Sequence, residues 1–300
     1  MSEHTIAFCN VGSKPKENSG IFGCSVNGFS SEEKCTSSTQ SAYSVWEHKL
    51  YGEVFKGSYD EVLKTISKLT FSPAITIVFF NKAEGFEQFL KSAAEILPST
   101  EFIGGGAAFS EEIHTGELLP EAADLCVLAI PEGNFRIETL NIYDDTKLQL
   151  EFEAASEREI TRIRELPDGR WHDAVTCYHS LQAKFDIEPD NFEKLCFSDH
   201  NRRNLHCSIK NGNLFAGANL PKDNLLSLNL ISPEKAVEKL RKFISTNDSL
   251  IFGCAGIRSL IDEPVYTGKR SLAGFMFGEI VNCGKQAELG NLMLTKLKIV

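Results

Sequence analysis

Two apolar segments near the C-terminal end of the chain decide its fold, and each contains glycines that flank polar side chains. Their sequences are Ser249-Leu-Ile-Phe-Gly253-Cys254-Ala-Gly256-Ile-Arg258 and Ser271-Leu-Ala-Gly274-Phe275-Met-Phe277-Gly278-Glu279-Ile280. A short apolar run broken by glycines is typical of a buried strand that delivers backbone amides to a sheet end, where ligands commonly bind. The glycine before Glu279 permits a close backbone approach that leaves room for a small molecule. The two segments therefore predict strands that line a ligand site.

The first half of the chain alternates between strand and helix patterns. Residues 74–80 form an apolar, β-rich run, and residues 85–97 place their apolar side chains on one helical face. A short strand at 102–103 then ends in Gly104, Gly105 and Gly106. Strand, helix and strand in so few residues predict a sheet covered by helices. Residues 125–130 and 135–142 predict a hairpin around Pro131-Glu-Gly133-Asn.

The second half shows the same mixture of elements. Apolar spacing predicts helices over 173–185 and 233–244, and the strands follow at 205–209, 214–216, 225–229, 250–252, 272–281 and 290–299. Residues 152–166 are charged and change their period before the turn Pro167-Asp-Gly169, which places a domain boundary here. We therefore expect an α+β protein of mixed, largely antiparallel sheets covered by helices. Its two halves are expected to span residues 1–165 and 166–300.

At the glycine-flanked segments quoted first, the chain resembles the FIST family of intracellular sensor modules, which combine a FIST-N and a FIST-C region and bind small ligands. The likeness extends upstream to Leu195-Cys-Phe-Ser-Asp-His200 through Asn213-Leu-Phe-Ala-Gly217-Ala-Asn-Leu-Pro221, to Pro73-Ala-Ile-Thr-Ile-Val-Phe-Phe80 and to Glu101-Phe-Ile-Gly104-Gly105-Gly106-Ala. It covers about residues 60–300. The resemblance implies that residues 1–165 are FIST-N-like, with the first 60 or so unmapped, and that residues 166–300 are FIST-C-like.

The chain departs from the family pattern at two of these places. The family tends to carry a basic residue directly after Cys-Ala-Gly, whereas here Ile257 precedes Arg258. Where FIST-N commonly reads Gly-Cys-Ser-Thr-Ala-Gly-Glu, this chain has Gly104-Gly-Gly-Ala-Ala-Phe-Ser110, and a better echo, Gly23-Cys24-Ser-Val-Asn-Gly28, lies near the start. The resemblance therefore does not carry a ligand identity with it.

Composition excludes several classes of function. The net charge of −10 and the pI near 5.3 argue against binding to nucleic acid, which needs clustered Lys and Arg. The N-terminus lacks a signal-peptide pattern, and no apolar run is long enough to cross a bilayer, so we expect a cytoplasmic protein with no membrane role. Nine cysteines without a Cys-x-x-Cys pair favour reduced, mostly buried thiols over a disulfide framework or a zinc site.

The charged residues of the two quoted segments suit an amino-acid ligand or a similar metabolite. A guanidinium such as Arg258 binds a carboxylate, and a carboxylate such as Glu279 accepts from an ammonium group. Each also has a simpler interpretation, as a solvated charge or a local partner of backbone amides. The glycines at 104–106 either cradle an anion through their amides or form a tight turn with positive φ.

Two alternatives to reversible ligand binding stay open. Cys254 is either a buried apolar side chain or the nucleophile of a thiol-dependent enzyme, although no His partner is recognisable. A branch related to FIST binds haem and senses nitric oxide, which makes histidines candidate iron ligands; these are His172, His179, His200 and His206. His172 and His179 share a face if residues 172–185 are helical, and Arg202-Arg203 beside His200 could pair with propionates.

The sequence therefore predicts a sensory protein rather than an enzyme, without catalytic residues. Its ligand is expected between the two halves, and a signalling partner protein would read the bound state. The expected ligand-binding residues are Gly104, Gly105, Gly106, Gly253, Cys254, Gly256, Arg258, Phe275, Gly278 and Glu279. No cofactor is required, and haem is the cofactor that the family resemblance leaves open.

Overall fold

The protein has the expected α+β fold, in which mixed β-sheets are covered by helices. The computed structural model describes residues 1–10, 20–36, 40, 42–81, 84–107, 113–115, 123–188, 194–259, 264–283, 286–290 and 292–300. The chain forms two compact units. Unit 1 holds Met1–Leu140, Leu240–Leu289 and Met293–Val300, and unit 2 holds Asn141–Lys239 and Gly290–Leu292. The boundary expected between residues 165 and 166 falls inside unit 2, because most of unit 2 is inserted into the chain of unit 1.

The sheet of unit 1 contains thirteen strands among the described residues, in the order β7-β2-β1-β4-β8-β5-β6-β19-β18-β21-β9, with β20 and β3 also paired to β19. The strands are β1 Ser2–Asn10, β2 Ile21–Val26, β3 Phe29–Ser31, β4 Tyr43–Gly57, β5 Ile75–Phe80, β6 Glu101–Gly106, β7 Ile113–Thr115, β8 Leu125–Ile130, β9 Phe135–Asn141, β18 Ser249–Cys254, β19 Leu272–Cys283, β20 Gln286–Leu289 and β21 Met293–Ile299. The residues that the family resemblance left unmapped supply β1 to β4. They complete the sheet rather than adding a separate element.

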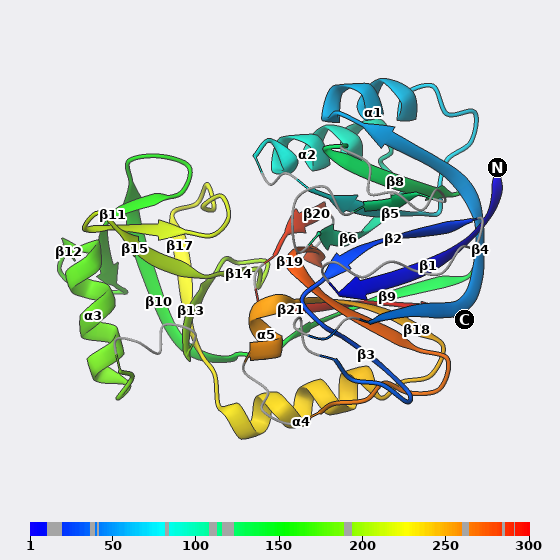
Figure 1. Cartoon of the computed structure of the whole chain (residues 1–300). Helices are drawn as coiled ribbons and strands as arrows, with labels where there is room; N and C mark the ends of the chain where they lie inside the picture. The colour runs from blue at the N-terminus through cyan, green and yellow to red at the C-terminus, as the bar shows by residue number, and fades with distance from the viewer. Residues whose placement is uncertain are drawn as a thin grey trace. The chain divides into compact units, whose positions relative to one another are not determined.

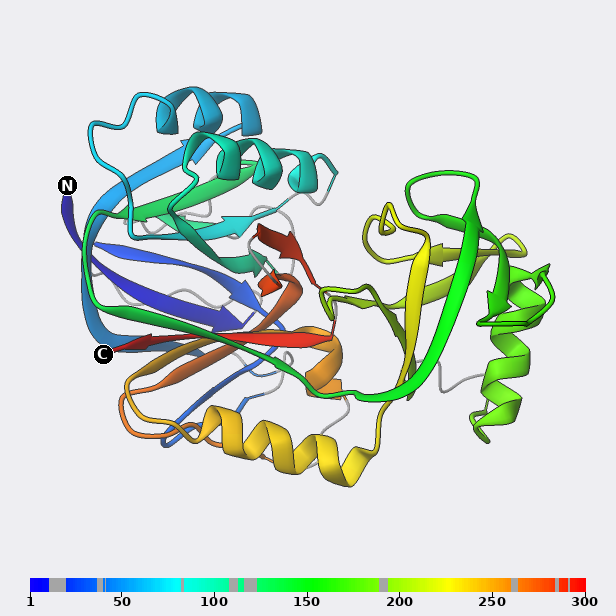
Figure 2. The same ribbon diagram turned by 180° about the vertical axis from the view of Figure 1, so that it is seen from behind.

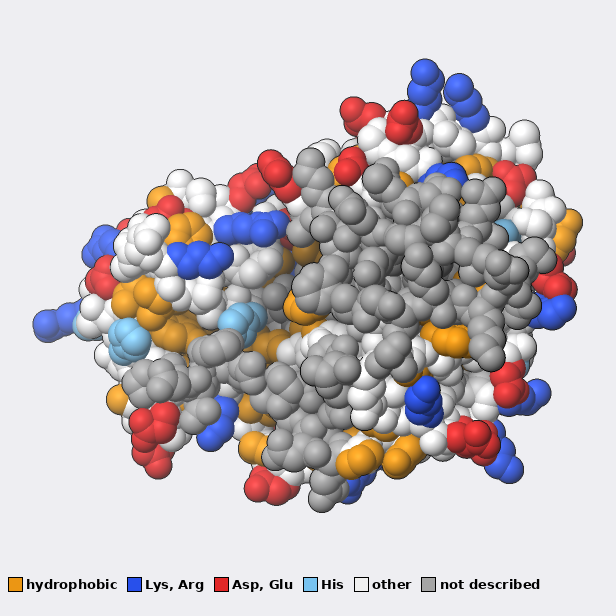
Figure 3. Space-filling model, in the orientation of Figure 1, with side chains coloured by type: hydrophobic (Ala, Val, Ile, Leu, Met, Phe, Trp, Pro, Cys, Tyr) orange, Lys and Arg blue, Asp and Glu red, His pale blue; other side chains and the backbone are white. Residues whose placement is uncertain are grey.

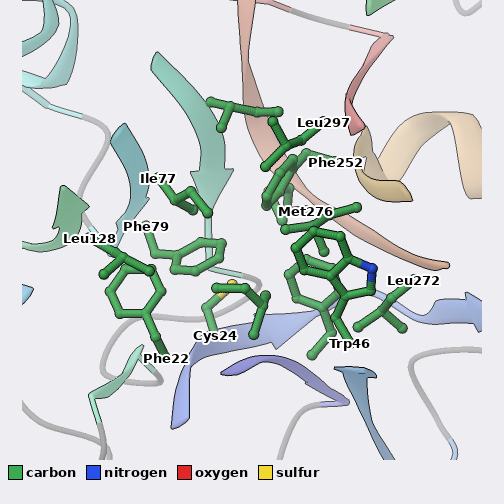
Figure 4. Close-up of a cluster of buried hydrophobic side chains, with 14 of the residues drawn as sticks. Phe22, Cys24, Trp46, Ile77, Phe79, Leu128, Phe252, Leu272, Met276 and Leu297 are labelled. Atoms are coloured by element: carbon green, nitrogen blue, oxygen red, sulfur yellow. The ribbon is translucent and has the colours of Figure 1, made fainter. Parts of the chain in front are cut away.

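Two strands that are close in the sequence of unit 1 pair at distant places in the sheet order. β2 pairs with β1, whereas β3, which begins after two further residues, pairs with β19. Side chains from both parts therefore meet in one core, where the rings of Phe22 and Phe79 lie 5.1 Å apart and those of Phe8 and Phe252 lie 5.8 Å apart. Figure 4 shows this aromatic cluster with Trp46 and Met276 beside it. Burying each large apolar side chain contributes about 1.5–3 kcal/mol.

Helices cover this sheet, and two of them, α2 and α4, lie in the ranges 85–97 and 233–244 that apolar spacing predicted. α1 (Tyr59–Ile66) and α2 (Phe86–Ile96) lie side by side over one face of the sheet (Figure 1). The side chain of Ser58 accepts from the Glu61 amide and Glu61 accepts from the Ser58 amide, which forms a capping box at the start of α1. α4 (Pro233–Ile244) begins with proline at its first position, and the short α5 (Ala255–Ser259) follows β18 directly.

Unit 2 is an antiparallel sheet with one helix packed on it. Its strands are β10 Asp144–Ala154, β11 Glu159–Glu165, β12 His172–Asp173, β13 Leu195–Ser198, β14 Asn204–Leu205, β15 Cys207–Lys210, β16 Asn213–Ala216 and β17 Leu225–Leu230, in the order β14-β13-β17-β10-β11-β16-β15 with β12 beside β11. α3 (Ala174–Lys184) starts after Asp173, whose carboxylate accepts from the Thr176 amide at 3.0 Å. Tyr178 and Leu181 of α3 pack with Phe152 and Phe197 of the sheet.

The hairpin expected from residues 125–130 and 135–142 is wrong. β8 lies between β4 and β5, and β9 pairs with β21 near the C-terminus, as seen from behind in Figure 2. The turn residues suit a hairpin, but both edges of β8 are occupied by other strands of the central sheet. Long-range pairing therefore overrides the local turn signal.

The helix hydropathy, the surface charge and the cysteine burial of the described residues agree with the composition. No helix in the described part of the chain is long and apolar enough to cross a bilayer. Acidic and basic side chains of described residues are interspersed on the face shown in Figure 3. No disulfide joins the described cysteines, and most of these are buried, as the cysteine spacing predicts.

Candidate functional site

The two segments that open the sequence argument lie on neighbouring strands together with the triple glycine. β18 and β19 run parallel with Cys254 opposite Met276, and β19 runs antiparallel to β6 with Glu279 opposite Gly105. Residues from both sequence halves therefore meet inside unit 1. All ten expected ligand-binding residues belong to this unit: Gly104, Gly105, Gly106, Gly253, Cys254, Gly256, Arg258, Phe275, Gly278 and Glu279.

The triple glycine is part of strand β6 and does not form a turn after it. A Cβ atom on Gly104 would lie 1.9 Å from the Val78 carbonyl oxygen, and one on Gly106 would lie 2.1 Å from that of Phe277. Gly104 also has a φ of +138°, a conformation that side chains rarely adopt. All three glycines pair with β5, and Gly105 and Gly106 pair with β19 as well. Close strand packing therefore explains them, and the anion cradle gains no support.

Gly278 turns Glu279 into the protein. It has a φ of +73° and stands where the register between β19 and β6 shifts, between Phe277 and Glu279. A bulge of this kind changes the direction of the next side chain. The exposed fraction accordingly falls from 51% at Phe277 to 0% at Glu279. Gly278 therefore orients Glu279 through the bulge. The expectation that this glycine leaves room for a small molecule stays a prediction.

The buried Glu279 carboxylate has one satisfied oxygen and one unsatisfied oxygen. Oε1 accepts from the Met293 amide at 2.7 Å, whereas Oε2 has no hydrogen-bond partner among the described residues. Burial raises the pKa of this carboxyl from 4.5 to about 7, although hydrogen bonds from its own amide, the Met293 amide and the Cys254 thiol oppose the rise. Within the described part of the chain, no ion pair neutralises Glu279. The site therefore favours a donor or a cation.

Cys254 is partly exposed at the end of β18, and its thiol donates a hydrogen bond to the Glu279 carboxylate. A nucleophilic cysteine needs its thiolate form, which nearby positive charge stabilises. An ionised Glu279 has the opposite effect, because its negative charge repels a thiolate. The carboxylate gives no support to an activated thiolate, and thiol-dependent catalysis by Cys254 stays a prediction.

The remaining predicted residues have separate roles. Phe275 is buried, and its ring lies against Gly253, where an added Cβ would be 3.1 Å from a ring carbon. Phe275 is therefore a packing residue. Gly256 and the backbone of Arg258 lie in α5, but the Arg258 side chain lies outside the described residues. Its expected role as a carboxylate-binding group stays a prediction.

The four histidines lie at separate places in unit 2: His172 in β12, His179 in α3, His200 in the turn after β13 and His206 between β14 and β15. His172 lies in β12 before α3 begins, so the expected helical face shared with His179 is wrong. His179 contacts Gln182, and His200 pairs with Asp223. Arg203 has partners within unit 2: its guanidinium donates hydrogen bonds to the Asp199 carboxylate and to the Asn219 carbonyl. No cluster of three metal-binding side chains occurs in the described ranges, and haem binding stays a prediction.

One partner of the site left no signal in the sequence. The Met293 amide binds Glu279 through the backbone, and a backbone donor does not depend on residue type.

No protein-family model matches the chain, and no curated protein matches it. The resemblance to the FIST family therefore remains a prediction from the quoted residues.

Proposed function

We propose that this protein is a sensory module that binds a small molecule in unit 1, beside Glu279 and Cys254. The bound state would be read by a signalling partner protein in the cytoplasm, the location expected from the sequence. An ammonium group, as in an amino acid or a related metabolite, forms a charge-assisted hydrogen bond with a carboxylate such as Glu279.

One observation carries the proposal: Glu279 is fully buried and its Oε2 has no described hydrogen-bond partner. An unsatisfied buried acceptor costs about 1–3 kcal/mol and more if charged, so a donor supplied by a ligand recovers that free energy. Support also comes from Cys254, which is partly exposed and in contact with the carboxylate. A ligand that reaches the thiol is thereby beside Glu279.

The test is a thermal-shift screen of amino acids and small amines against the wild type and the Glu279→Gln variant. A ligand at about 100 times its Kd should stabilise the folded protein by about 2.7 kcal/mol. We expect the wild type to gain this stability and Glu279→Gln to lose most of it, because an amide binds an ammonium group more weakly than a carboxylate does.

Glu101→Gln is the matched control, since Glu101 is an exposed glutamate on the neighbouring strand β6. This variant should respond to ligand as the wild type does. Absence of stabilisation by every compound, or equal stabilisation of Glu279→Gln, would remove the proposal.

A further inference from the structure

Two polar side chains of helix α3 are buried inside unit 2, and each has a polar atom without a hydrogen-bond partner among the described residues. Tyr178 and Gln182 are each 2% exposed, and the atoms are the Tyr178 hydroxyl oxygen and Gln182 Nε2. A buried group that has given up its hydrogen bonds to water without replacing them costs free energy. Because buried polar groups in native proteins nearly always have a partner, these two atoms indicate a place for one.

The two groups lie one helical turn apart on the same face of α3. Residues four apart on a helix have Cβ atoms about 5–6 Å from each other. Tyr178 on this face packs in the core of unit 2 with Phe197 and Cys207 of the sheet, and its ring meets that of Phe197 edge-on with 6.0 Å between centroids. A single small molecule between α3 and the sheet can therefore contact both the hydroxyl and the amide.

Both groups are hydrogen-bond donors. Burial raises the pKa of the Tyr178 hydroxyl above its ordinary value, with smaller contributions from the Cys207 and Cys196 thiols, so the phenol keeps its proton. Gln182 Oε1 contacts His179 Nδ1 at 3.0 Å, which leaves the two hydrogens of Nε2 to a further partner. An O–H and an NH₂ group one turn apart are complementary to an oxygen acceptor.

The surroundings of the two donors favour a neutral oxygen over an anion. Tyr178 and Gln182 carry no charge, and the core of unit 2 around Tyr178 is built mainly of apolar side chains. A carboxylate or a phosphate would lose its hydration here without gaining a charged partner from either group. A ketone or amide carbonyl has two lone pairs for the two donors and costs much less to remove from water.

We propose that unit 2 contains a second binding site, in which Tyr178 and Gln182 hold the carbonyl oxygen of a small, neutral, largely apolar molecule. Glu279 belongs to unit 1, so the two sites share no residue. They also differ in chemistry, since the carboxylate accepts from an ammonium group whereas these two side chains donate to an oxygen. Binding in unit 2 therefore does not depend on the function proposed above.

Titration of the ¹⁵N-labelled full chain with cyclohexanone and with N-methylacetamide, followed by NMR, tests the site. Gln182→Met identifies the side-chain amide signals of Gln182, because they are missing from its spectrum. We expect at least one of the two carbonyl compounds to shift these signals saturably. Methylenecyclohexane, which has the shape of cyclohexanone but lacks its oxygen, should leave them in place.

Tyr178→Phe removes one of the two donors and keeps the ring. Its affinity for the carbonyl compound should fall by about two- to tenfold, the range that one hydrogen bond contributes. Tyr51→Phe is the matched control, because Tyr51 is an exposed tyrosine of unit 1 and its substitution should leave the affinity unchanged. No saturable shift with either carbonyl compound, or equal affinities for wild type and Tyr178→Phe, overturns the site.

Hydrogen exchange of α3 in the ligand-free chain gives a second measurement. A hydroxyl that lacks a partner contributes no hydrogen bond to the fold, so Tyr178→Phe should leave exchange of α3 unchanged or slow it. If the chain itself already satisfied this hydroxyl, the same substitution would remove a hydrogen bond and speed exchange of α3 relative to Tyr51→Phe. Faster exchange therefore overturns the proposal, and unchanged or slower exchange supports it.

Discussion

Each unit buries a carboxylate, but the two carboxylates differ in whether both oxygens have hydrogen-bond partners. In unit 2, Asp199 is 4% exposed and its Oδ1 accepts from the amides of Asn201 and Arg203, while its Oδ2 accepts from the Arg203 guanidinium at 3.0 Å. In unit 1, Glu279 accepts from the Met293 amide, its own amide and the Cys254 thiol, and no described cation pairs with it. A carboxylate with all its partners holds a loop in place, whereas one with an unsatisfied oxygen is available to a ligand.

This difference separates a structural acid from a candidate functional acid without reference to any relative. Asp199, Arg202 and Arg203 are close in sequence, so the loop closes on its own side chains. Glu279 meets Cys254 and Met293 only because β18, β19 and β21 come together in unit 1. The comparison predicts that substitutions of the first acid affect stability alone, whereas substitutions of the second change the pH response and ligand binding.

The largest expected effect is loss of the paired acid in unit 2. Arg203→Leu leaves Asp199 as a buried charge without its cation and should destabilise unit 2 by about 3–5 kcal/mol. Hydrogen exchange of α3 should report the loss, while ligand binding in unit 1 is retained. Arg202→Leu is the matched control. Because Arg202 is exposed, its substitution should lower the free energy of unfolding much less. Equal effects of the two substitutions would contradict the structural role of the pair.

The next effect is the pH dependence of unit 1. Because the pKa of Glu279 is about 7 in the folded state and near 4.5 when unfolded, its protonated form stabilises the fold fully below about pH 4.5, and this stability is lost as pH rises through about 7. The difference corresponds to about 3 kcal/mol. Urea unfolding at pH values between 4.5 and 8 measures this free-energy difference. The fluorescence of Trp46 reports the unfolding of unit 1 when the protein also carries Trp171→Phe.

Comparison with Glu279→Gln isolates this contribution from those of other titrating groups. Burial lowers the pKa of His4 in unit 1, which makes stability rise with pH and so acts in the opposite direction. The wild type should lose stability relative to Glu279→Gln as the pH rises. Parallel stability curves for the two proteins would show that Glu279 titrates normally.

The smallest expected effect compares helix caps in the two units. Ser58→Ala removes the capping box of α1, and Asp173→Ala removes the N-cap of α3, and each should cost about 1 kcal/mol of local stability. Peptide-resolved hydrogen exchange should show each effect confined to its own helix. A Ser58→Ala effect that spread to α3 would mean that the two units unfold as one.

Sequence alone determined the elements whose signals are local. The α4 helix spans the predicted residues 233–244, and Asp173 caps the helix that apolar spacing predicted over 173–185, because caps and periodicity act within a few residues. Caps and periodicity need no knowledge of the rest of the chain. The glycine-flanked segments also predicted that Cys254 and Glu279 lie close together, but the pairing of β18 with β19 is what brings them into contact.

Tertiary structure decided everything that depends on distant partners. The β8 and β9 strands were found in sequence but paired wrongly, since the neighbours of a strand are chosen by the whole sheet. Residues 1–57 joined that sheet without a recognisable motif. The insertion of unit 2, the burial of Glu279 behind the Gly278 bulge and its bond to the Met293 amide likewise depend on segments far apart in the chain. Hydrogen bonding to backbone and burial are properties of position, which residue type alone does not encode.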